Sequence, residues 1–175
     1  MTLKATMLSD AQLKLAGFVE LTPVVPLRAG EQRRTIWAKS ALRDLVTGKI
    51  TPKSGFPCLE FDLFVGRYCK GYIVSATRNK KKKSDFKWLQ DHPQVWVIAL
   101  RKPRPGWRFF GRFASKNRFI ILGAYVRSEL GDLADYNKQA SKIPSEWDAA
   151  FPNVPPFEGV TFHDYLGEIV RNDDE

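Results

Sequence analysis

Apolar residues recur with helical spacing in two segments of the N-terminal third. Residues 11–18 follow Asp10, which can cap a helix, and apolar positions at i, i+4, i+7 and i+8 lie between residues 29 and 47, just before Gly48. This spacing places apolar side chains on one face of a helix, and a glycine favours the helix end. The pattern therefore predicts two N-terminal helices.

The period of the apolar positions changes to two after Pro57. In residues 59–63 Leu and Phe alternate with Glu and Asp, and a second apolar stretch follows at residues 68–75. Alternation of this kind is typical of a half-buried strand, so we expect a hairpin. Residues 95–100 form a continuous apolar run that predicts a central strand, and residues 107–113 and 118–125 predict a second hairpin.

A third amphipathic segment follows the strands. Within residues 132–143, Leu133, Tyr136, Ala140 and Ile143 fall on one helical face. We predict an α+β fold with two N-terminal helices packed on a twisted antiparallel sheet of four to five strands and a closing helix. Residues 1–143 are expected to form one basic domain, and residues 144–175 a Pro-rich acidic C-terminal extension with a last helix over residues 162–170.

Charge is distributed unevenly along the chain. The formal net charge is +9, but residues 1–128 hold 25 Lys and Arg against 8 Asp and Glu, a net of +17, whereas residues 129–175 hold 3 against 11, a net of −8. Basic side chains that neutralise phosphates release condensed counterions. We therefore expect RNA or the ribosome as the partner, with DNA as the alternative polyanion, and we expect the segment after Ile143 to lie over the basic face.

The basic residues cluster most densely between residues 92 and 128, a stretch without any carboxylate. In the strand predicted at residues 107–113, alternation places Arg108, Phe110 and Arg112 on one side, where guanidinium groups can pair with phosphates and a ring can stack a base. Four adjacent lysines repel one another and predict a mobile loop. The candidate nucleic-acid-binding residues are Lys80, Lys81, Lys82, Lys83, Arg101, Lys102, Arg104, Phe110, Arg112, Lys116 and Arg118.

Residues 98–143 contain a recognisable succession of elements: Gly106-Trp107-Arg108-Phe109-Phe110, a turn, the apolar strand Arg118-Phe119-Ile120-Ile121-Leu122, a basic segment up to Arg127 and a helix with Tyr136. This pattern resembles the C-terminal half of the RelE/ParE toxin superfamily. The resemblance implies a toxin-antitoxin protein that cleaves messenger RNA without a metal, with Arg108, Arg127 and Tyr136 as catalytic residues and an antitoxin as a partner. The chain is longer than these toxins and adds the four lysines and the acidic end.

Other chemistries are less well supported by the sequence. Glu60, Asp62 and Lys70 resemble the donor set of a metal-dependent nuclease, but alternation places both carboxylates on the solvent face of the predicted strand. Cys58 and Cys69 lack zinc-ligand spacing. We therefore expect neither a metal nor a cofactor. The N-terminal residues and the absence of a long apolar run predict no export and no membrane span, hence a cytoplasmic protein.

Two alternatives to an RNA-cleaving toxin remain open at the level of sequence. The first is a non-catalytic nucleic-acid-binding or machine-inhibiting module of phage origin that uses the same basic residues as an electrostatic platform. The second is a protein-interaction subunit whose charge serves an acidic partner. Degradation of RNA in the presence of a chelator separates the enzyme from both alternatives.

Overall fold

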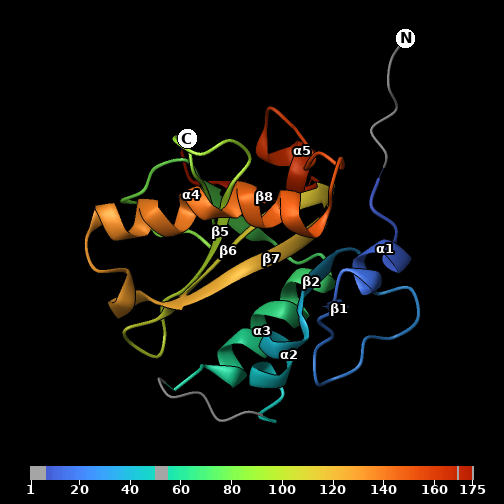
Figure 1. Cartoon of the computed structure of the whole chain (residues 1–175). Helices are drawn as coiled ribbons and strands as arrows, with labels where there is room; N and C mark the ends of the chain where they lie inside the picture. Colours follow the sequence, from blue (N-terminus) through green and yellow to red (C-terminus); the bar gives the residue numbers. More distant parts are fainter. Residues whose placement is uncertain (1–6, 50–54, 169, 175) are drawn as a thin grey trace.

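A computed structural model describes residues 7–49, 55–168 and 170–174 of the chain, and its centre is one mixed sheet of eight strands (Figure 1). The strands are β1 (Phe18–Glu20), β2 (Thr35–Lys39), β3 (Val74–Thr77), β4 (Phe86–Trp88), β5 (Trp96–Leu100), β6 (Trp107–Ser115), β7 (Arg118–Val126) and β8 (Val170–Asn172). Their order across the sheet is β1-β2-β7-β6-β5-β4-β3-β8. The expected antiparallel sheet of four to five strands is therefore wrong, although the α+β class holds.

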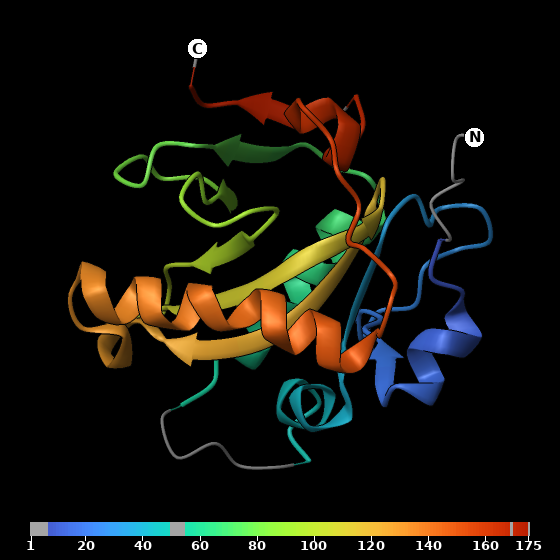
Figure 2. The ribbon, with the colours of Figure 1, turned by 45° about the horizontal axis from the view of Figure 1, so that its top comes forward.

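Helices cover both faces of this sheet. They are α1 (Asp10–Leu15), α2 (Ser40–Val46), α3 (Cys58–Cys69), the 3-10 helix η1 (Arg127–Leu130), α4 (Leu133–Ala150) and α5 (Phe162–Leu166). Helices α2, α3 and α5 bury side chains in one core with Phe109 and Phe113 of β6. Helix α4 crosses the opposite face, where Ala140 and Ile143 pack against Phe110 (Figure 2). No helix in the described ranges combines the length and apolar character that a membrane span requires.

The hairpin of β6 and β7 confirms the strongest prediction from alternation. Its two strands pair antiparallel, with Trp107 opposite Val126 and Phe113 opposite Phe119. The register shifts between Phe110 and Gly111, where a Cβ atom would lie 2.0 Å from the carbonyl oxygen of Ile120. Only glycine allows that approach. Strand β5 is also present at the predicted central run and pairs with β6.

The segment predicted as the second N-terminal helix contains strand β2 instead. Residues 35–39 pair in parallel with β7, with Ile36 opposite Phe119 and Trp37 opposite Ile120. Only the shorter helix α2 follows this strand. The prediction failed because β2 obtains its hydrogen bonds from a strand some eighty residues later, a contact that helical spacing cannot reveal. The first predicted helix is present as α1, capped by Ser9 rather than by Asp10.

The first predicted hairpin is wrong as well, because residues 59–63 belong to helix α3. The helix buries Phe61, Phe64, Val65 and Tyr68, which follow one another at helical intervals, and it exposes Leu59 at 66%. Five alternating residues fit a strand as well as a helix, so the buried positions further along the chain decide the structure. The hypothesis of a metal-dependent nuclease site required Glu60, Asp62 and Lys70 on two neighbouring strands. Glu60 and Asp62 lie on helix α3 instead, so that arrangement does not exist.

The acidic C-terminal part is built into the sheet and its cores. The expected division at Ile143 falls inside α4, which continues through Pro144 to Ala150 and is capped at its start by the carboxylate of Asp132. Trp147 is fully buried. Helix α5 packs on the other face, and β8 pairs in parallel with β3 at the sheet edge. The helix predicted over residues 162–170 is therefore a short helix followed by this strand.

Candidate nucleic-acid interface

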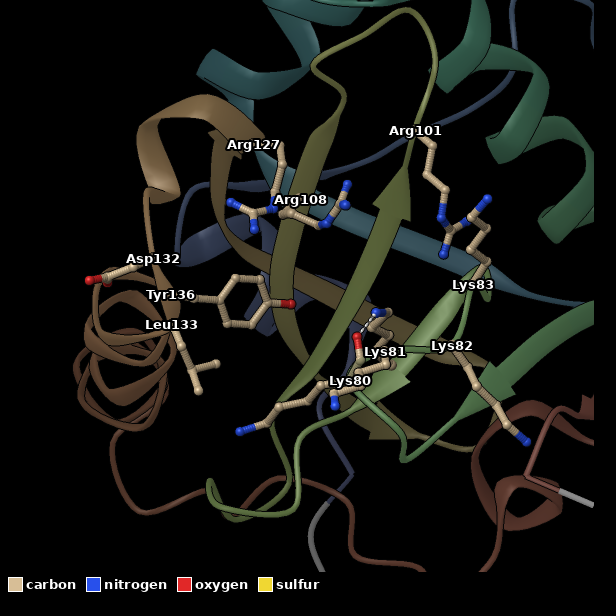
Figure 3. A pocket seen from close by; sticks show the side chains of 11 residues that line it. Lys80, Lys81, Lys82, Lys83, Arg101, Arg108, Arg127, Asp132, Leu133 and Tyr136 are labelled. Atoms are coloured by element: carbon tan, nitrogen blue, oxygen red, sulfur yellow. Dashed lines mark hydrogen bonds between the residues drawn. The ribbon is translucent and has the colours of Figure 1, made fainter.

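A cavity of about 430 Å³ opens on the α4 face of the sheet, and we name it the cationic cleft (Figure 3). Its lining residues are Lys80, Lys81, Lys82, Lys83, Lys87, Arg101, Arg108, Arg127, Asp132, Leu133 and Tyr136. Eight of these side chains are cationic and one is a carboxylate. Such a charge balance in a concave site attracts a polyanion and strengthens its pairing, because the walls exclude part of the solvent.

The sheet topology places these side chains together. Strands β4, β5 and β6 are neighbours, with Lys87 opposite Val97 and Ala99 opposite Arg108. Arg101 directly follows β5, and Arg127 begins η1 at the end of β7. The closing helix α4 then contributes Tyr136. Residues 78–85, which we call the lysine loop, connect β3 to β4 and complete the wall opposite α4 (Figure 3).

Lys87 has the most perturbed ammonium group of the cleft. Burial, together with the positive charges of Arg108, Arg101 and Arg127, lowers the pKa of Lys87 to about 8. Its Nζ atom donates a hydrogen bond to the backbone carbonyl of Lys80, which fixes the ammonium group at the cleft wall. An amine with such a pKa is neutral in part at physiological pH, so Lys87 can accept a proton as well as neutralise a phosphate.

Arg108 and Tyr136 form the floor of the cleft beside α4. The Nη1 atom of Arg108 donates to the backbone carbonyls of Leu100 at 2.8 Å and Trp107 at 2.9 Å, so its guanidinium group has a fixed orientation. Burial raises the pKa of Tyr136 to about 12, against the opposing effect of Arg108 and Arg127. The ring of Tyr136 packs on Phe110, with 5.1 Å between centroids. Its phenol therefore stays protonated at neutral pH.

The lysine loop lies between β3 and β4, where the sequence predicts a loop. Two of its four lysines contact oxygen atoms elsewhere in the chain. Lys80 forms an ion pair with Asp91, and Lys82 donates to the backbone carbonyl of Asp173. These contacts tie the lysine loop to its surroundings, and Figure 3 shows that the ammonium group of Lys82 points away from Tyr136 and Arg108.

The structure corrects the expected arginine–aromatic–arginine face of β6. Phe110 is fully buried under α4, so its ring belongs to the core and offers no surface to a base. Arg112 is only 6% exposed, and its Nη2 atom donates to the carbonyl of Pro93 at 2.8 Å. Of the three side chains, only Arg108 lines the cleft. The covering element is α4, whose second half includes residues after Ile143.

The remaining candidate residues lie away from the cleft. Lys102 and Arg104 are exposed in the turn between β5 and β6. At the opposite end of the hairpin, Arg118 forms an ion pair of 2.7 Å with Asp10. Lys116 lines a separate cavity of about 350 Å³. That second cavity also contains Arg33, Arg34 and Lys70, and it lies at the end of β6 remote from Arg108.

Sequence reasoning missed Lys87, Asp132 and Leu133 as lining residues of the cleft. Lys87 stands between Phe86 and Trp88 and looks like an ordinary solvent-facing position in a strand. Its position directly after the lysine cluster was the available signal. Asp132 precedes α4 and has a capping role, because it accepts hydrogen bonds from the backbone of Ala134 and Asp135.

Comparisons with protein-family models, with curated proteins and with solved structures give no match for the chain. Within the described residues, no group of three or more His, Cys, Asp or Glu side chains is arranged to hold a metal ion. The cysteines of this part of the chain, Cys58 and Cys69, are both free thiols.

Proposed function

We propose that the chain binds single-stranded RNA in the cationic cleft and cleaves the bound strand without a metal ion, as a toxin of the toxin-antitoxin type does. The observation that carries this proposal is the convergence of eight cationic side chains on one cavity with a single carboxylate. Phosphate groups of a polynucleotide are the ligands that such a site neutralises best, and prepositioned cations stabilise the additional negative charge of a cleavage transition state.

The reaction uses the 2′-hydroxyl group of the RNA as its nucleophile. Neutral Lys87 accepts the 2′-hydroxyl proton, and the 2′-oxygen attacks the adjacent phosphorus. Arg101, Arg108 and Arg127 stabilise the charge on the phosphorane oxygens. The bond to the 5′-oxygen breaks as Tyr136 donates its phenolic proton, which leaves a 2′,3′-cyclic phosphate and a 5′-hydroxyl. The lowered pKa of Lys87 suits a base that is partly neutral at physiological pH. The raised pKa of Tyr136 makes its phenol a weaker acid but keeps it protonated, so that it has a proton to donate to the 5′-oxygen.

The resemblance to the RelE/ParE superfamily supports the same assignment. Arg108, Arg127 and Tyr136 were assigned to catalysis from short motifs, and all three line one cavity. The order of strand, turn, strand, basic segment and helix also holds, as β6, β7, η1 and α4. We place the protein in the cytoplasm, where reducing conditions suit the free Cys58 and Cys69 and where messenger RNA and ribosomes are found. An antitoxin would present acidic side chains to the cleft.

A non-catalytic nucleic-acid-binding module is the second candidate function. It is favoured by the hydrogen bonds of Arg108 to two backbone carbonyls, which use part of its donor capacity for structure. In this alternative the cleft is an electrostatic platform for RNA, DNA or the ribosome, and none of its side chains transfers a proton.

Incubation of the purified protein with single-stranded RNA in the presence of a chelator tests the proposal, with and without translating ribosomes. We expect fragments that end in a 2′,3′-cyclic phosphate and no scission where the cleaved nucleotide carries a 2′-deoxy sugar. Lys87→Met should abolish scission, while the matched variant Lys83→Met at the same cleft retains it. Binding without scission, both with and without translating ribosomes, would establish the non-catalytic alternative, and absence of binding would refute both.

A further inference from the structure

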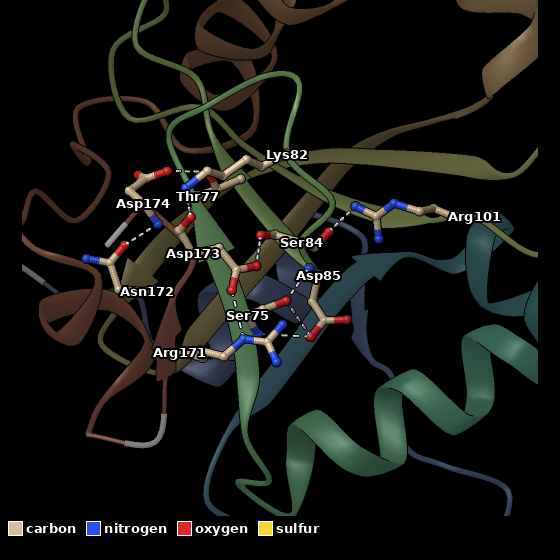
Figure 4. A network of polar contacts seen from close by, with 10 residues as sticks. All are labelled: Ser75, Thr77, Lys82, Ser84, Asp85, Arg101, Arg171, Asn172, Asp173 and Asp174. Atoms are coloured by element: carbon tan, nitrogen blue, oxygen red, sulfur yellow. Dashed lines mark hydrogen bonds and ion pairs between the residues drawn. The ribbon is translucent and has the colours of Figure 1, made fainter.

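The lysine loop is fixed by the C-terminal residues Asp173 and Asp174, almost a hundred residues further along the chain (Figure 4). These two residues directly follow β8, whose parallel pairing with β3 places them beside the start of the loop. The backbone N–H of Asp173 extends that pairing by donating to the carbonyl of Ala76 at 2.9 Å. Asp173 and Asp174 thus lie against the segment that carries four of the eight cleft cations.

Asp173 contacts the loop with both its backbone and its side chain. Its carboxylate accepts a hydrogen bond from the hydroxyl group of Ser84, and its carbonyl oxygen accepts one from the ammonium group of Lys82. A second carboxylate oxygen pairs with Arg171 at 2.7 Å. Burial alone would raise the pKa of Asp173, but the hydrogen bonds from Arg171 and Ser84 outweigh it and keep the pKa below its ordinary value.

Asp174 holds the other end of the loop. Its carboxylate accepts hydrogen bonds from the hydroxyl group of Thr77 and, at 2.7 Å, from the backbone N–H of Arg78. The hydroxyl oxygen of Thr77 also accepts from the backbone N–H of Asn79 at 2.9 Å. Thr77 is fully buried and Ser84 is 1% exposed, so both hydroxyl groups are fixed donors within the protein rather than at its surface.

The contact continues from the loop to the cleft itself. The Nη2 atom of Arg101 donates to the backbone carbonyl of Ser84, the same residue whose hydroxyl group contacts Asp173. Figure 4 shows Arg101, Ser84 and Asp173 in this sequence of contacts. A displacement of Ser84 would therefore move a guanidinium group of the cleft as well as the neighbouring lysines.

We infer that Asp173 and Asp174 are positioning residues for the cationic cleft, because they hold the backbone of the lysine loop at the cleft wall, from which lysine side chains can reach a polyanion. Four adjacent lysines repel one another and would spread apart without such anchors. This inference rests on the proposed binding of RNA in the cleft, but it also makes a claim about the unliganded chain. The acidic end of the chain thereby supports the basic site and does not compete with its ligand.

The sign of the effect on binding separates positioning from simple electrostatics. Removal of two carboxylates makes the protein more positive and should strengthen binding of any polyanion. If Asp173 and Asp174 position the lysine loop, their removal should instead weaken polyanion binding. The variant Asp173→Ala/Asp174→Ala is to be compared with Glu146→Ala/Asp148→Ala, which removes the same charge from exposed positions on α4. The variant Ser84→Ala keeps the charge unchanged and removes one of the donors to Asp173.

The experiment measures hydrogen exchange of residues 78–85 in the unliganded full-length chain, and the affinity for a short oligouridylate as a function of salt. Thermal unfolding verifies that each variant is folded. We expect faster exchange in the loop for both Asp173→Ala/Asp174→Ala and Ser84→Ala, an affinity about three- to tenfold weaker, and a smaller salt dependence, because fewer ammonium groups reach phosphates. In the variant Glu146→Ala/Asp148→Ala on α4, hydrogen exchange of residues 78–85 should match that of wild type, and the oligouridylate should bind slightly more tightly.

Two results would overturn the inference: unchanged exchange in the loop, or tighter binding by Asp173→Ala/Asp174→Ala that matches the α4 variant. Failure of the proposed function has a different signature. If wild type does not bind the oligouridylate while exchange in the loop rises in both loop variants, the anchoring role stands and the RNA site is refuted. If the wild type binds and Ser84→Ala neither loosens the loop nor weakens binding, the RNA site stands and the anchoring role is refuted.

Discussion

The ammonium group of Lys87 donates a hydrogen bond to the backbone carbonyl oxygen of Lys80, and this contact joins β4 to the lysine loop at the wall of the cationic cleft. The carbonyl dipole partly offsets the repulsion between the two lysines. Lys80 obtains further compensation from its ion pair with Asp91. A dense group of cations can therefore persist in the unliganded protein, and a bound phosphate would further offset the mutual repulsion of Lys87, Arg108, Arg101 and Arg127.

Substitution of Lys87 by Met should stabilise the fold at neutral pH. The folded-state pKa of about 8 lies below the ordinary value of 10.5, so the folded chain binds this proton more weakly than the unfolded chain. The resulting penalty is fully present below pH 8 and disappears as the pH rises through 10.5. We expect a gain of about 1 kcal/mol at pH 7, limited by solvent screening of a partly exposed group. Urea unfolding at pH 7 and pH 10 measures the difference, and an equal effect at both pH values would contradict it.

The same pKa predicts the pH dependence of cleavage. Because only neutral Lys87 accepts the 2′-hydroxyl proton, the single-turnover rate at saturating protein should increase as the pH rises from 6 through about 8 and then level off. Bound phosphate raises the pKa of a nearby ammonium group, so the midpoint should lie at or above the value of the free protein. Lys83→Met should keep this profile. A rate that does not vary with pH in the wild type would exclude Lys87 as the base.

Tyr136→Phe separates a proton donor from a core aromatic residue. The ring contact with Phe110 remains in the variant, so the melting temperature and the affinity for RNA should change little. The cleavage rate should fall about a hundredfold, within the range that general acid catalysis contributes. Single-turnover kinetics under saturating protein provides the measurement. An unchanged rate would show that the tyrosine serves packing alone.

Arg108 and Arg112 should respond in different ways to substitution by Ala, although alternation places them on the same side of β6. Loss of Arg112 leaves the carbonyl of Pro93 without this donor under α4 and should cost about 1–3 kcal/mol of stability, with RNA affinity unchanged in the folded fraction. Loss of Arg108 should weaken RNA binding. Urea unfolding and RNA-binding titrations of both variants test this difference. The prediction would be contradicted if Arg112→Ala reduced RNA affinity as much as Arg108→Ala does.

The sequence was sufficient to predict elements that depend on local patterns. Strands β5, β6 and β7 were predicted because long apolar runs end at turn residues, and α4 because its apolar residues keep helical spacing for three turns. Strands β2 and β8 were not found, because their partners β7 and β3 lie far away in the chain. Strand β8 has only three residues and contains little signal of its own. Strand β2 continues directly into α2, and the helical spacing of the joined segment concealed it.

Prediction of the candidate site from sequence had a similar limit. Residue type pointed to Arg101, Arg108 and the four lysines, and the resemblance to the RelE/ParE superfamily added Arg127; the fold places all of them around one cavity. Alternation also assigned the side of β6 correctly. It could not show that α4 covers Phe110, that Arg112 is buried, and that Arg108 lines the cleft. Which part of a sheet face is covered depends on tertiary packing, and the pattern of a single strand does not contain it.

The salt dependence of RNA binding tests the central claim, that the cationic cleft binds the phosphate backbone, most directly. In a plot of log affinity against log salt, the variant Lys87→Gln/Arg101→Gln/Arg127→Gln should have a slope smaller in magnitude than wild type by about 2. Each lost phosphate contact on single-stranded RNA reduces the magnitude of this slope by about 0.7. The matched variant Arg33→Gln/Lys70→Gln/Lys116→Gln removes the same charge from the second cavity. It should keep the wild-type slope. Equal slopes in the two variants would contradict the assignment of the cleft as the RNA site.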